Sequence, residues 1–255
     1  ICIFFFSMNI SVSTFLIRYT MSNMDSMNTR KFPSGIKLIT LDLDDTLWPC
    51  MPVIHRAEDA LHDWLSEHAP ELANQHSVES LREHRRTLAR QNPDIAYNLT
   101  LTRKMSLQML LIQFGYDKKL AQPAIDVFRN ARNQVEPFED VIPALEELGK
   151  RYYLVAVTNG NVELSRTPVS AYFRHALTAE SVGAAKPDPA IFTEAMKRAH
   201  TTPEETLHIG DDPETDIEAA RQIGLHSIWM NRYQQPWPGN IEPALTEVNN
   251  LYSVI

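Results

Sequence analysis

Two aspartates, Asp42 and Asp44, follow an apolar run that begins at Leu38. A buried parallel strand is typically a continuous apolar run, and α/β sheets bind their ligands at the carboxyl ends of such strands. In extended backbone, side chains two residues apart project to the same side. Neighbouring carboxylates repel each other unless a cation neutralises them or one of them carries a proton. The spacing therefore indicates a site for a hard divalent cation.

Three further polar motifs follow the first in the chain: Thr158-Asn159-Gly160 after a second apolar run, Lys186 just before a predicted helix, and Asp211-Asp212 at the start of the predicted helix Pro213–Ile223. Each motif alone has an ordinary structural explanation. Asp and Thr favour turns and helix caps, and most lysines are solvated surface residues. Three of the four motifs lie at strand ends, however, and their order favours one shared site.

The scaffold for these motifs is predicted from apolar periodicity. Four runs predict strands, namely Lys37–Asp42, Tyr152–Thr158, Thr206–Gly210 and His226–Met230. From Tyr153 onward the strands alternate with helical segments of ordinary length, which is typical of βαβ units. We therefore predict an α/β fold built on a parallel sheet.

A different pattern lies between the first and second strands. Residues 53–135 contain no convincing strand, and four helical patterns occupy them: one from Val53, then Ser80–Arg90, Asp94–Phe114 and Asp117–Arg132. We predict a helical cap over 53–135, inserted into a core of residues 35–52 and 136–255. Within the cap Asn98, Arg103 and Lys104 are candidates for substrate contact, although a solvated helix face explains them equally.

The charge balance limits the class of partner. The chain of 255 residues has a formal net charge of −8 and no dense block of Lys or Arg. Nucleic acids and anionic membranes bind basic faces, so neither is expected as a partner. The sequence gives no prediction of the oligomeric state.

The two cysteines, Cys2 and Cys50, have no CxxC spacing, so neither a disulfide framework nor a thiolate metal site is expected. A reducing compartment, and hence a cytoplasmic location, is the simplest prediction. Cys50 and Arg56 have the spacing of thiolate phosphatases. Their loop contains no glycine, however, and Pro52 removes one amide donor, so we interpret that match as coincidence.

The first 34 residues do not resemble the rest of the chain. Residues 1–17 are apolar but lack a preceding basic region, and the first positive charge is Arg18. We interpret residues 1–34 as disordered or as an over-extended start, with translation beginning at Met21, Met24 or Met27.

In type, order and approximate spacing, the four motifs resemble those of the haloacid dehalogenase superfamily of aspartate-nucleophile phosphatases. The sequence is most similar to the branch with an all-helical cap, which includes FMN and 5-amino-6-(5-phosphoribitylamino)uracil phosphatases. The resemblance implies a doubly wound, Rossmann-like parallel sheet with an inserted α-helical cap. It also implies Mg²⁺-dependent hydrolysis of a small phosphorylated metabolite, FMN or another riboflavin-pathway phosphate among the candidates.

The resemblance assigns catalytic and phosphate-binding roles. Asp42 would be the nucleophile that forms an aspartyl-phosphate, and Asp44 would be the general acid and base. Thr158 and Asn159 would donate hydrogen bonds to the phosphoryl oxygens, and Lys186 would supply a fixed positive charge.

The implied Mg²⁺ ligands are the carboxylates of Asp42 and Asp211, with the backbone carbonyl of Asp44 as a third. Asp212 fits either a helix N-cap or a direct ligand, and the sequence leaves both open. Asp216 is expected to be a structural hydrogen-bonding residue.

Three other functions fit the same fold. In haloacid dehalogenases the position two after the nucleophile is usually not Asp, so Asp44 argues against that reaction. A phosphomutase would use the same residues. A non-catalytic metabolite-binding protein has no need to keep the nucleophile, which disfavours it.

Overall fold

The computed structural model describes residues 33–255, and Gly35–Ile255 form one compact unit. The expectation for residues 1–34 concerns a segment that lies almost wholly outside the described residues. Within the described part, no helix combines the length and the apolarity needed to cross a membrane.

The centre of the unit is a six-stranded sheet in which every neighbouring pair is parallel. Its order is β3-β2-β1-β4-β5-β6, with bounds β1 Leu38–Leu41, β2 Tyr153–Thr158, β3 His175–Thr178, β4 Thr206–Gly210, β5 His226–Met230 and β6 Glu247–Val248. The chain runs outward from β1 to β3 and then returns to β4 on the other side of β1. This reversal makes the sheet doubly wound, as predicted, and places a ligand crevice at the carboxyl end of β1.

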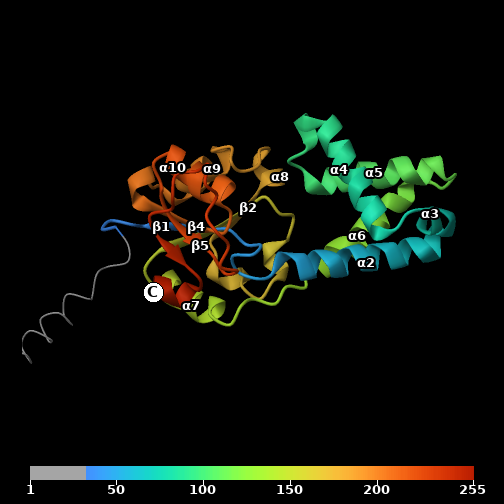
Figure 1. Ribbon diagram of the computed structural model, residues 1–255. Helices are drawn as coiled ribbons and strands as arrows, with labels where there is room; N and C mark the ends of the chain where they lie inside the picture. The colour runs from blue at the N-terminus through green and yellow to red at the C-terminus, as the bar shows by residue number, and fades with distance from the viewer. Residues whose placement is uncertain (1–32) are drawn as a thin grey trace, which may run out of the picture. The chain divides into compact units, whose positions relative to one another are not determined.

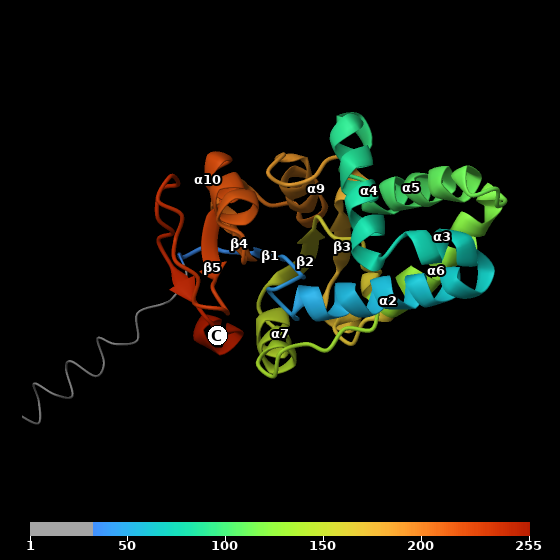
Figure 2. The ribbon, with the colours of Figure 1, turned by 45° about the vertical axis from the view of Figure 1, so that its right-hand side comes forward.

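Helices cover both faces of the sheet, as Figures 1 and 2 show, with α9 and α10 on one face and α7 on the other. The strand residues alternate accordingly. Val155 and Val157 pack in a cluster with Phe192 of α9 and Ala220 of α10, and Leu154 and Ala156, which alternate with them along β2, are also buried. Burial on both faces explains why these strands read as unbroken apolar runs. The bounds of the helices are α7 Val141–Gly149, α8 Ala179–Val182, α9 Ala190–Ala199 and α10 Ala219–Gln222.

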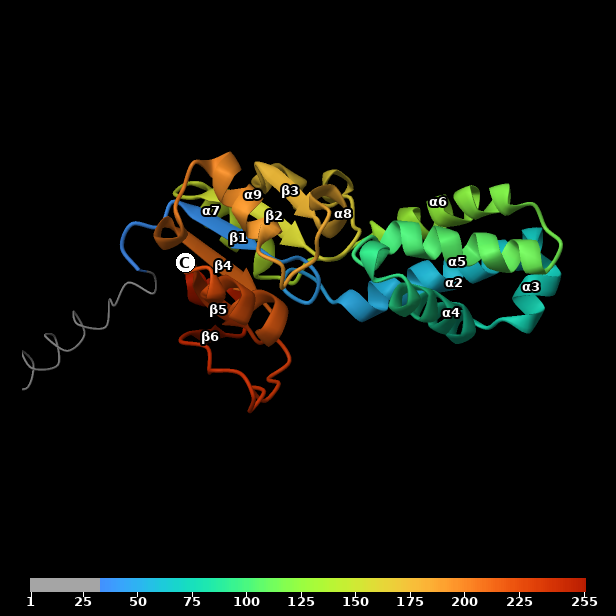
Figure 3. The same cartoon turned by 90° about the horizontal axis from the view of Figure 1, so that it is seen from above.

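Five α-helices precede α7 in the long connection between β1 and β2: α2 Cys50–His68, α3 Pro70–Gln75, α4 Val78–Gln91, α5 Leu99–Gln113 and α6 Ala121–Arg132. We call residues 50–132 the helical insertion (Figure 3). It has its own hydrophobic cluster, in which Leu61 and Leu65 of α2 meet Leu110 of α5 and Phe128 of α6. The division into core and cap at residues 53 and 135 stays a prediction.

Two kinds of difference separate this fold from the sequence prediction. Strands β3 and β6 were not predicted, because β3 has only four residues, of which Leu177 alone is buried, and β6 has two. The predicted helix Asp94–Phe114 begins instead at Leu99. A 3₁₀ turn occupies Pro93–Ile95, and the Asn98 side chain accepts a hydrogen bond from the backbone N–H of Leu101 as the N-cap of α5.

Candidate active site

The carboxyl ends of β1, β2 and β4 lie side by side. Leu41 of β1 pairs with Ala156 of β2 and with Ile209 of β4. Asp42 continues that register, since its backbone N–H donates to the carbonyl of Ile209 at 2.9 Å. Residues two positions farther along β2 and β4, Thr158 and Asp211, therefore come to the same edge as Asp42.

Lys186 joins this edge from the loop between α8 and α9. Its ammonium donates to Asp42 Oδ1 at 2.6 Å, to Asp216 Oδ1 at 2.5 Å and to the carbonyl of Val157 at 3.2 Å. The residue is only 4% exposed, so it is not a solvated surface lysine. Burial alone would lower the pKa of Lys186, but the charges of Asp216 and Asp42 outweigh it and raise that pKa. The ammonium is thus a fixed cation.

Asn159 positions the Lys186 loop through a pair of hydrogen bonds. Its side-chain amide donates to the Lys186 carbonyl at 2.9 Å, and its Oδ1 accepts from the Lys186 N–H at 2.7 Å. The side chain is therefore used for structure, which leaves the backbone of Asn159 as the group that can face a ligand.

Asp216 is buried, and both of its carboxylate oxygens already accept hydrogen bonds from the protein. It accepts hydrogen bonds from Lys186, from His208 Nε2 at 3.1 Å and from the backbone N–H of Asp212 at 3.0 Å. Burial raises the pKa of Asp216, but the Lys186 charge and the His208 hydrogen bond outweigh it and hold that pKa below its usual range. A Cβ on Gly210 would meet the Asp216 carboxyl carbon at 2.3 Å, so this close approach requires glycine.

Asp44 is held by two groups that sequence reasoning did not assign to the site. Trp48 Nε1 donates to Asp44 Oδ1 at 2.9 Å, and Arg132 Nη2 donates to the same oxygen at 2.7 Å. Arg132, the last residue of α6, is 1% exposed, and its Nε and Nη1 have no hydrogen-bond partner among the described residues. Its place 88 positions after Asp44 in the chain gave no sequence signal.

Thr158 and Gly160 form the turn opposite Asp44. Thr158 Oγ1 accepts from the Gly160 N–H at 2.9 Å. A Cβ on Gly160 would lie 2.6 Å from Asp44 Oδ2 and 3.2 Å from Arg132 Nη2. Glycine is required here because the turn, the Asp44 carboxylate and the guanidinium share one small space.

The two remaining carboxylates of the edge, Asp42 and Asp211, lie in a buried site where Lys186 pairs with Asp42. Burial raises the pKa of Asp42 to about 8, although Lys186 opposes the shift. Burial and then the negative charges of Asp42 and Asp216 raise the pKa of Asp211 to about 9. Thr46 Oγ1 donates to Asp211 Oδ1 at 3.2 Å. Three clustered carboxylates thus share one ammonium, that of Lys186.

The donor set fits a hard divalent cation. Carboxylate oxygens of Asp42, Asp211 and Asp216 lie within 4.8 Å of one another. Asp216 is occupied by three donors, which leaves Asp42 and Asp211 as the available carboxylates. Asp212 is the N-cap of the π-helical turn Pro213–Glu218, because its Oδ1 accepts from the backbone N–H groups of Glu214 and Thr215. The structure thus favours the cap among the two alternatives for Asp212.

The coincidental thiolate motif is inert. Cys50 begins α2, and burial together with the charge of Asp44 raises the pKa of its thiol to about 12. Arg56 instead donates to the carbonyl of Gln134. Cys50 therefore keeps its thiol proton at neutral pH and does not provide a nucleophilic thiolate.

Comparison with known proteins supplies the final observation. A family model described as haloacid dehalogenase-like hydrolase matches residues 36–224. The 5-amino-6-(5-phospho-D-ribitylamino)uracil phosphatase YigB of Escherichia coli (strain K12) is 28% identical over 227 residues, which cover 86% of this chain and 94% of the relative. Glyceraldehyde 3-phosphate phosphatase of Methanopyrus kandleri is 28% identical over 219 residues, covering 80% and 89%. A crystal structure titled 2-haloacid dehalogenase, from Pseudomonas syringae pv. Tomato DC3000, is 40% identical with a TM-score of 0.81, covering 86% and 96%.

Proposed function

Because the chain belongs to the haloacid dehalogenase-like hydrolases, we propose that it hydrolyses the phosphate monoester of a small metabolite through an aspartyl-phosphate on Asp42. The family match confirms the superfamily and the hydrolase class predicted from the sequence. The observation that carries the proposal is the meeting of Asp42, Lys186 and Thr158 in one buried site, beside an Asp44 that is held in place.

In the first step an Asp42 carboxylate oxygen forms a bond to phosphorus and the bond from phosphorus to the ester oxygen breaks. Asp44 gives its proton to the departing alkoxide. In the second step Asp44 takes a proton from the water that attacks the phosphoryl group, and inorganic phosphate leaves Asp42. The two steps restore both aspartates.

Arg132 and Trp48 are the positioning residues for Asp44 in this scheme. Their donors hold the Asp44 carboxylate in one place beside Asp42 for both proton transfers.

The Thr158 hydroxyl and the backbone N–H of Asn159 would donate hydrogen bonds to the phosphoryl oxygens, and the Lys186 ammonium would supply a positive charge close to them. Lys186 contributes fixed charge that needs no reorganisation during the reaction, because two aspartates and a carbonyl already hold it. Negative charge develops on these oxygens in the transition state, so the same contacts strengthen as the reaction proceeds.

Asp42 and Asp211 would hold Mg²⁺, with the Asp44 backbone carbonyl as the further ligand. The donor set fits this ion, because hard carboxylate oxygens of Asp42 and Asp211 lie within 4.8 Å of each other. When bound, the ion neutralises charge on the phosphoryl oxygens. The residues of the chain do the proton transfer and the attack.

For the substrate we propose a phosphorylated metabolite of small size, with FMN and other riboflavin-pathway phosphates as first candidates. Two curated relatives support this class by name, one a ribitylaminouracil phosphatase and one a glyceraldehyde 3-phosphate phosphatase. The expected cytoplasmic location and the expected lack of nucleic-acid partners stay predictions.

A dehalogenase is the second candidate, because the structure that is 40% identical has that title. That reaction also begins with an aspartate nucleophile, but it needs neither a cation nor a proton for the halide. Asp44 and the Asp211 carboxylate would then be without a purpose, which is why we prefer the phosphatase.

The deciding experiment measures phosphate and halide release by the same purified protein. We expect phosphate release with Mg²⁺ from p-nitrophenyl phosphate and from FMN or other metabolites, loss of activity with EDTA, and no halide release from 2-chloropropionate. Halide release without phosphate release would favour the dehalogenase. Conversion of glucose 1-phosphate to glucose 6-phosphate would indicate a phosphomutase, and tight binding without turnover would indicate a binding protein.

A further inference from the structure

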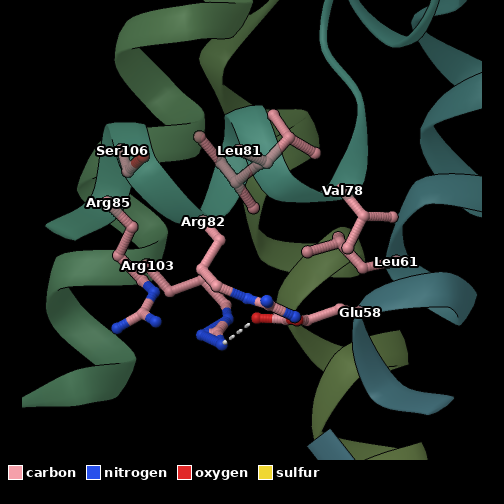
Figure 4. Close-up of a pocket in the computed structure, with 9 residues that line it drawn as sticks. Glu58, Leu61, Val78, Leu81, Arg82, Arg85, Arg103 and Ser106 are labelled. Carbon is pink, nitrogen blue, oxygen red and sulfur yellow. Dashed lines mark hydrogen bonds and ion pairs between the residues drawn. The ribbon is translucent and has the colours of Figure 1, made fainter. Parts of the chain in front are cut away.

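The helical insertion contains a pocket rich in arginine, at the junction of α2, α4 and α5. Figure 4 shows Arg82 and Arg103 directed toward Glu58, with Arg85 beside Arg103. The remaining lining residues are Leu61, Val78, Leu81, Ser106 and Leu107. We call this site the arginine pocket.

The acids near the arginine pocket do not balance its cations. Arg82 is satisfied: its Nε donates to Glu58 at 3.0 Å and its Nη1 to the exposed Glu79 at 2.6 Å. Arg103 has only a longer ion pair with Glu58, 3.5 Å between Nη2 and Oε1. Arg85 has no hydrogen bond or salt bridge recorded among the described residues. Glu58 is thus shared by Arg82 and Arg103, so one acid lines the pocket against three guanidinium groups.

This imbalance is costly because Arg103 is buried. Its side chain is 9% exposed, and its guanidinium carbon lies 3.7 Å above the centre of the Phe128 ring. Burial and the neighbouring charge of Arg85 lower the pKa of Arg103 to about 9. Buried charges are normally balanced, so a pocket with three guanidinium groups and one carboxylate is typical of a site that receives an anionic ligand.

The arginine pocket is connected to the active site through two neighbouring contacts. Phe128, which lies under Arg103, is one turn before Arg132 on α6, about 6 Å along the axis, and Arg132 contacts Asp44. On the other side, Thr100 lies one turn before Arg103 on α5. The Thr100 hydroxyl is 3.4 Å from the side-chain amide of Asn161, in the loop that follows Thr158.

From this arrangement we infer that the substrate carries a second anionic group, a carboxylate or a phosphate, which binds Arg103 and Arg85 while the reacting phosphate lies at Asp42. The inference deepens the proposed function and rests on it. A planar carboxylate or a phosphate suits guanidinium donors because each can accept two parallel hydrogen bonds. The substrate class is thus a phosphomonoester with a distant second anion, which narrows the candidates named above by excluding FMN, whose only anionic group is its single phosphate.

The first test measures binding, so that it does not depend on turnover. We would titrate three probes with one six-carbon skeleton into the Asp42→Asn variant with Mg²⁺ by calorimetry: glucose 6-phosphate, 6-phosphogluconate and glucose 1,6-bisphosphate. We expect the two probes with a second anion to bind about tenfold more tightly than glucose 6-phosphate, as one charge-assisted contact provides. The carboxylate and phosphate arms distinguish the two sources of the anion.

The second test places Arg103→Met and Arg85→Met in the same background, with Arg86→Met as the matched control. Arg86 is on the same helix as Arg85 but its side chain is 51% exposed, and it pairs only with Glu79 and Glu83. We expect Arg103→Met and Arg85→Met to remove the preference for the second anion and Arg86→Met to keep it. Arg85, the less buried position, keeps the test valid if Arg103→Met does not fold, as judged by circular dichroism.

The two tests distinguish failure of the proposed anion site from failure of the proposed phosphatase function. Equal binding of all three probes, or a preference that survives both substitutions, overturns the inference. An arginine-dependent preference in a protein that releases no phosphate from these probes or from p-nitrophenyl phosphate supports the anion site while contradicting the proposed function.

Discussion

The carboxyl edge of the sheet and the arginine pocket show opposite imbalances of buried charge. At the sheet edge, burial among other carboxylates raises the pKa values of Asp42 to about 8 and Asp211 to about 9. In the arginine pocket, burial beside another guanidinium lowers the pKa of Arg103 to about 9. At the sheet edge one ammonium, that of Lys186, faces three carboxylates, and in the arginine pocket one carboxylate, that of Glu58, faces three guanidinium groups. Each imbalance indicates the charge of the ligand that would complete it.

Among the substitutions considered, replacing the proposed nucleophile Asp42 should have the largest effect on activity. We expect Asp42→Asn to reduce phosphatase turnover by about 10³-fold or more, because the amide cannot form the aspartyl-phosphate. Phosphate release with p-nitrophenyl phosphate measures the loss. Asp45→Asn is the matched control, since Asp45 is three positions away and bonds to Cys50 and Tyr233 outside the cluster. Equal activity of Asp42→Asn and the wild type would end this mechanism.

The charge imbalance at the sheet edge is tested by Asp211→Asn. Removing this carboxylate should raise the Mg²⁺ concentration for half-maximal activity roughly 100-fold, because one hard oxygen ligand is weakened. Asp212→Asn provides the control, since Asn is as good an N-cap as Asp. A similar loss of Mg²⁺ affinity in both variants would assign the cation to Asp212 as well.

Arg132 belongs to the helical insertion but contacts Asp44 at the sheet edge, so its substitution tests whether the insertion positions Asp44. We expect Arg132→Met to lower kcat roughly tenfold for alkyl phosphates, which need a proton on the leaving group, and less for p-nitrophenyl phosphate. Thermal unfolding is measured in parallel, since breaking a buried ion pair destabilises the fold. Arg129→Met, on the same helix but paired with Glu163 in a half-exposed position, is the control. A uniform loss with both substrates would indicate a merely structural role.

The last prediction concerns the pH dependence of stability in the metal-free protein. Asp42 and Asp211 keep their protons in the folded state to about pH 8 and 9, whereas in the unfolded chain their pKa is 3.8. The folded state then binds more protons than the unfolded state, so stability falls as pH rises from about 5 to 9. Thermal melts should show this slope, and Mg²⁺ should raise the melting temperature more at pH 9 than at pH 6. A rising melting temperature over that range would contradict the charge assignment.

The candidate active site at the carboxyl edge of the sheet could be predicted from the sequence because most of its residues directly follow strands. The apolar runs before Asp42, Thr158 and Asp211 located three strands, and parallel topology brings their carboxyl ends together without further information. Lys186 follows no strand, and it was identified only through the resemblance to known motifs. Its burial between Asp42 and Asp216 is a tertiary feature.

The roles of the residues in the helical insertion could not be predicted from the sequence in the same way. Arg132 ends an ordinary helical pattern, and its contact with Asp44 depends on how α6 meets the sheet edge. Of the three insertion residues considered from the sequence, Asn98 is a helix cap and Lys104 donates to Gln122 on α6. Only Arg103 is buried in a pocket, and no spacing rule distinguishes it from a solvated arginine.

Trapping the proposed aspartyl-phosphate would test the mechanism most directly. Asp44→Asn should still form the phosphoenzyme with p-nitrophenyl phosphate, whose leaving group needs no proton, but should hydrolyse it slowly. After an acid quench, mass spectrometry of the proteolysed protein should find one phosphoryl group on the peptide that contains Asp42. Absence of the phosphoryl group in a variant that still releases nitrophenol, or its presence on another residue, would contradict the central claim.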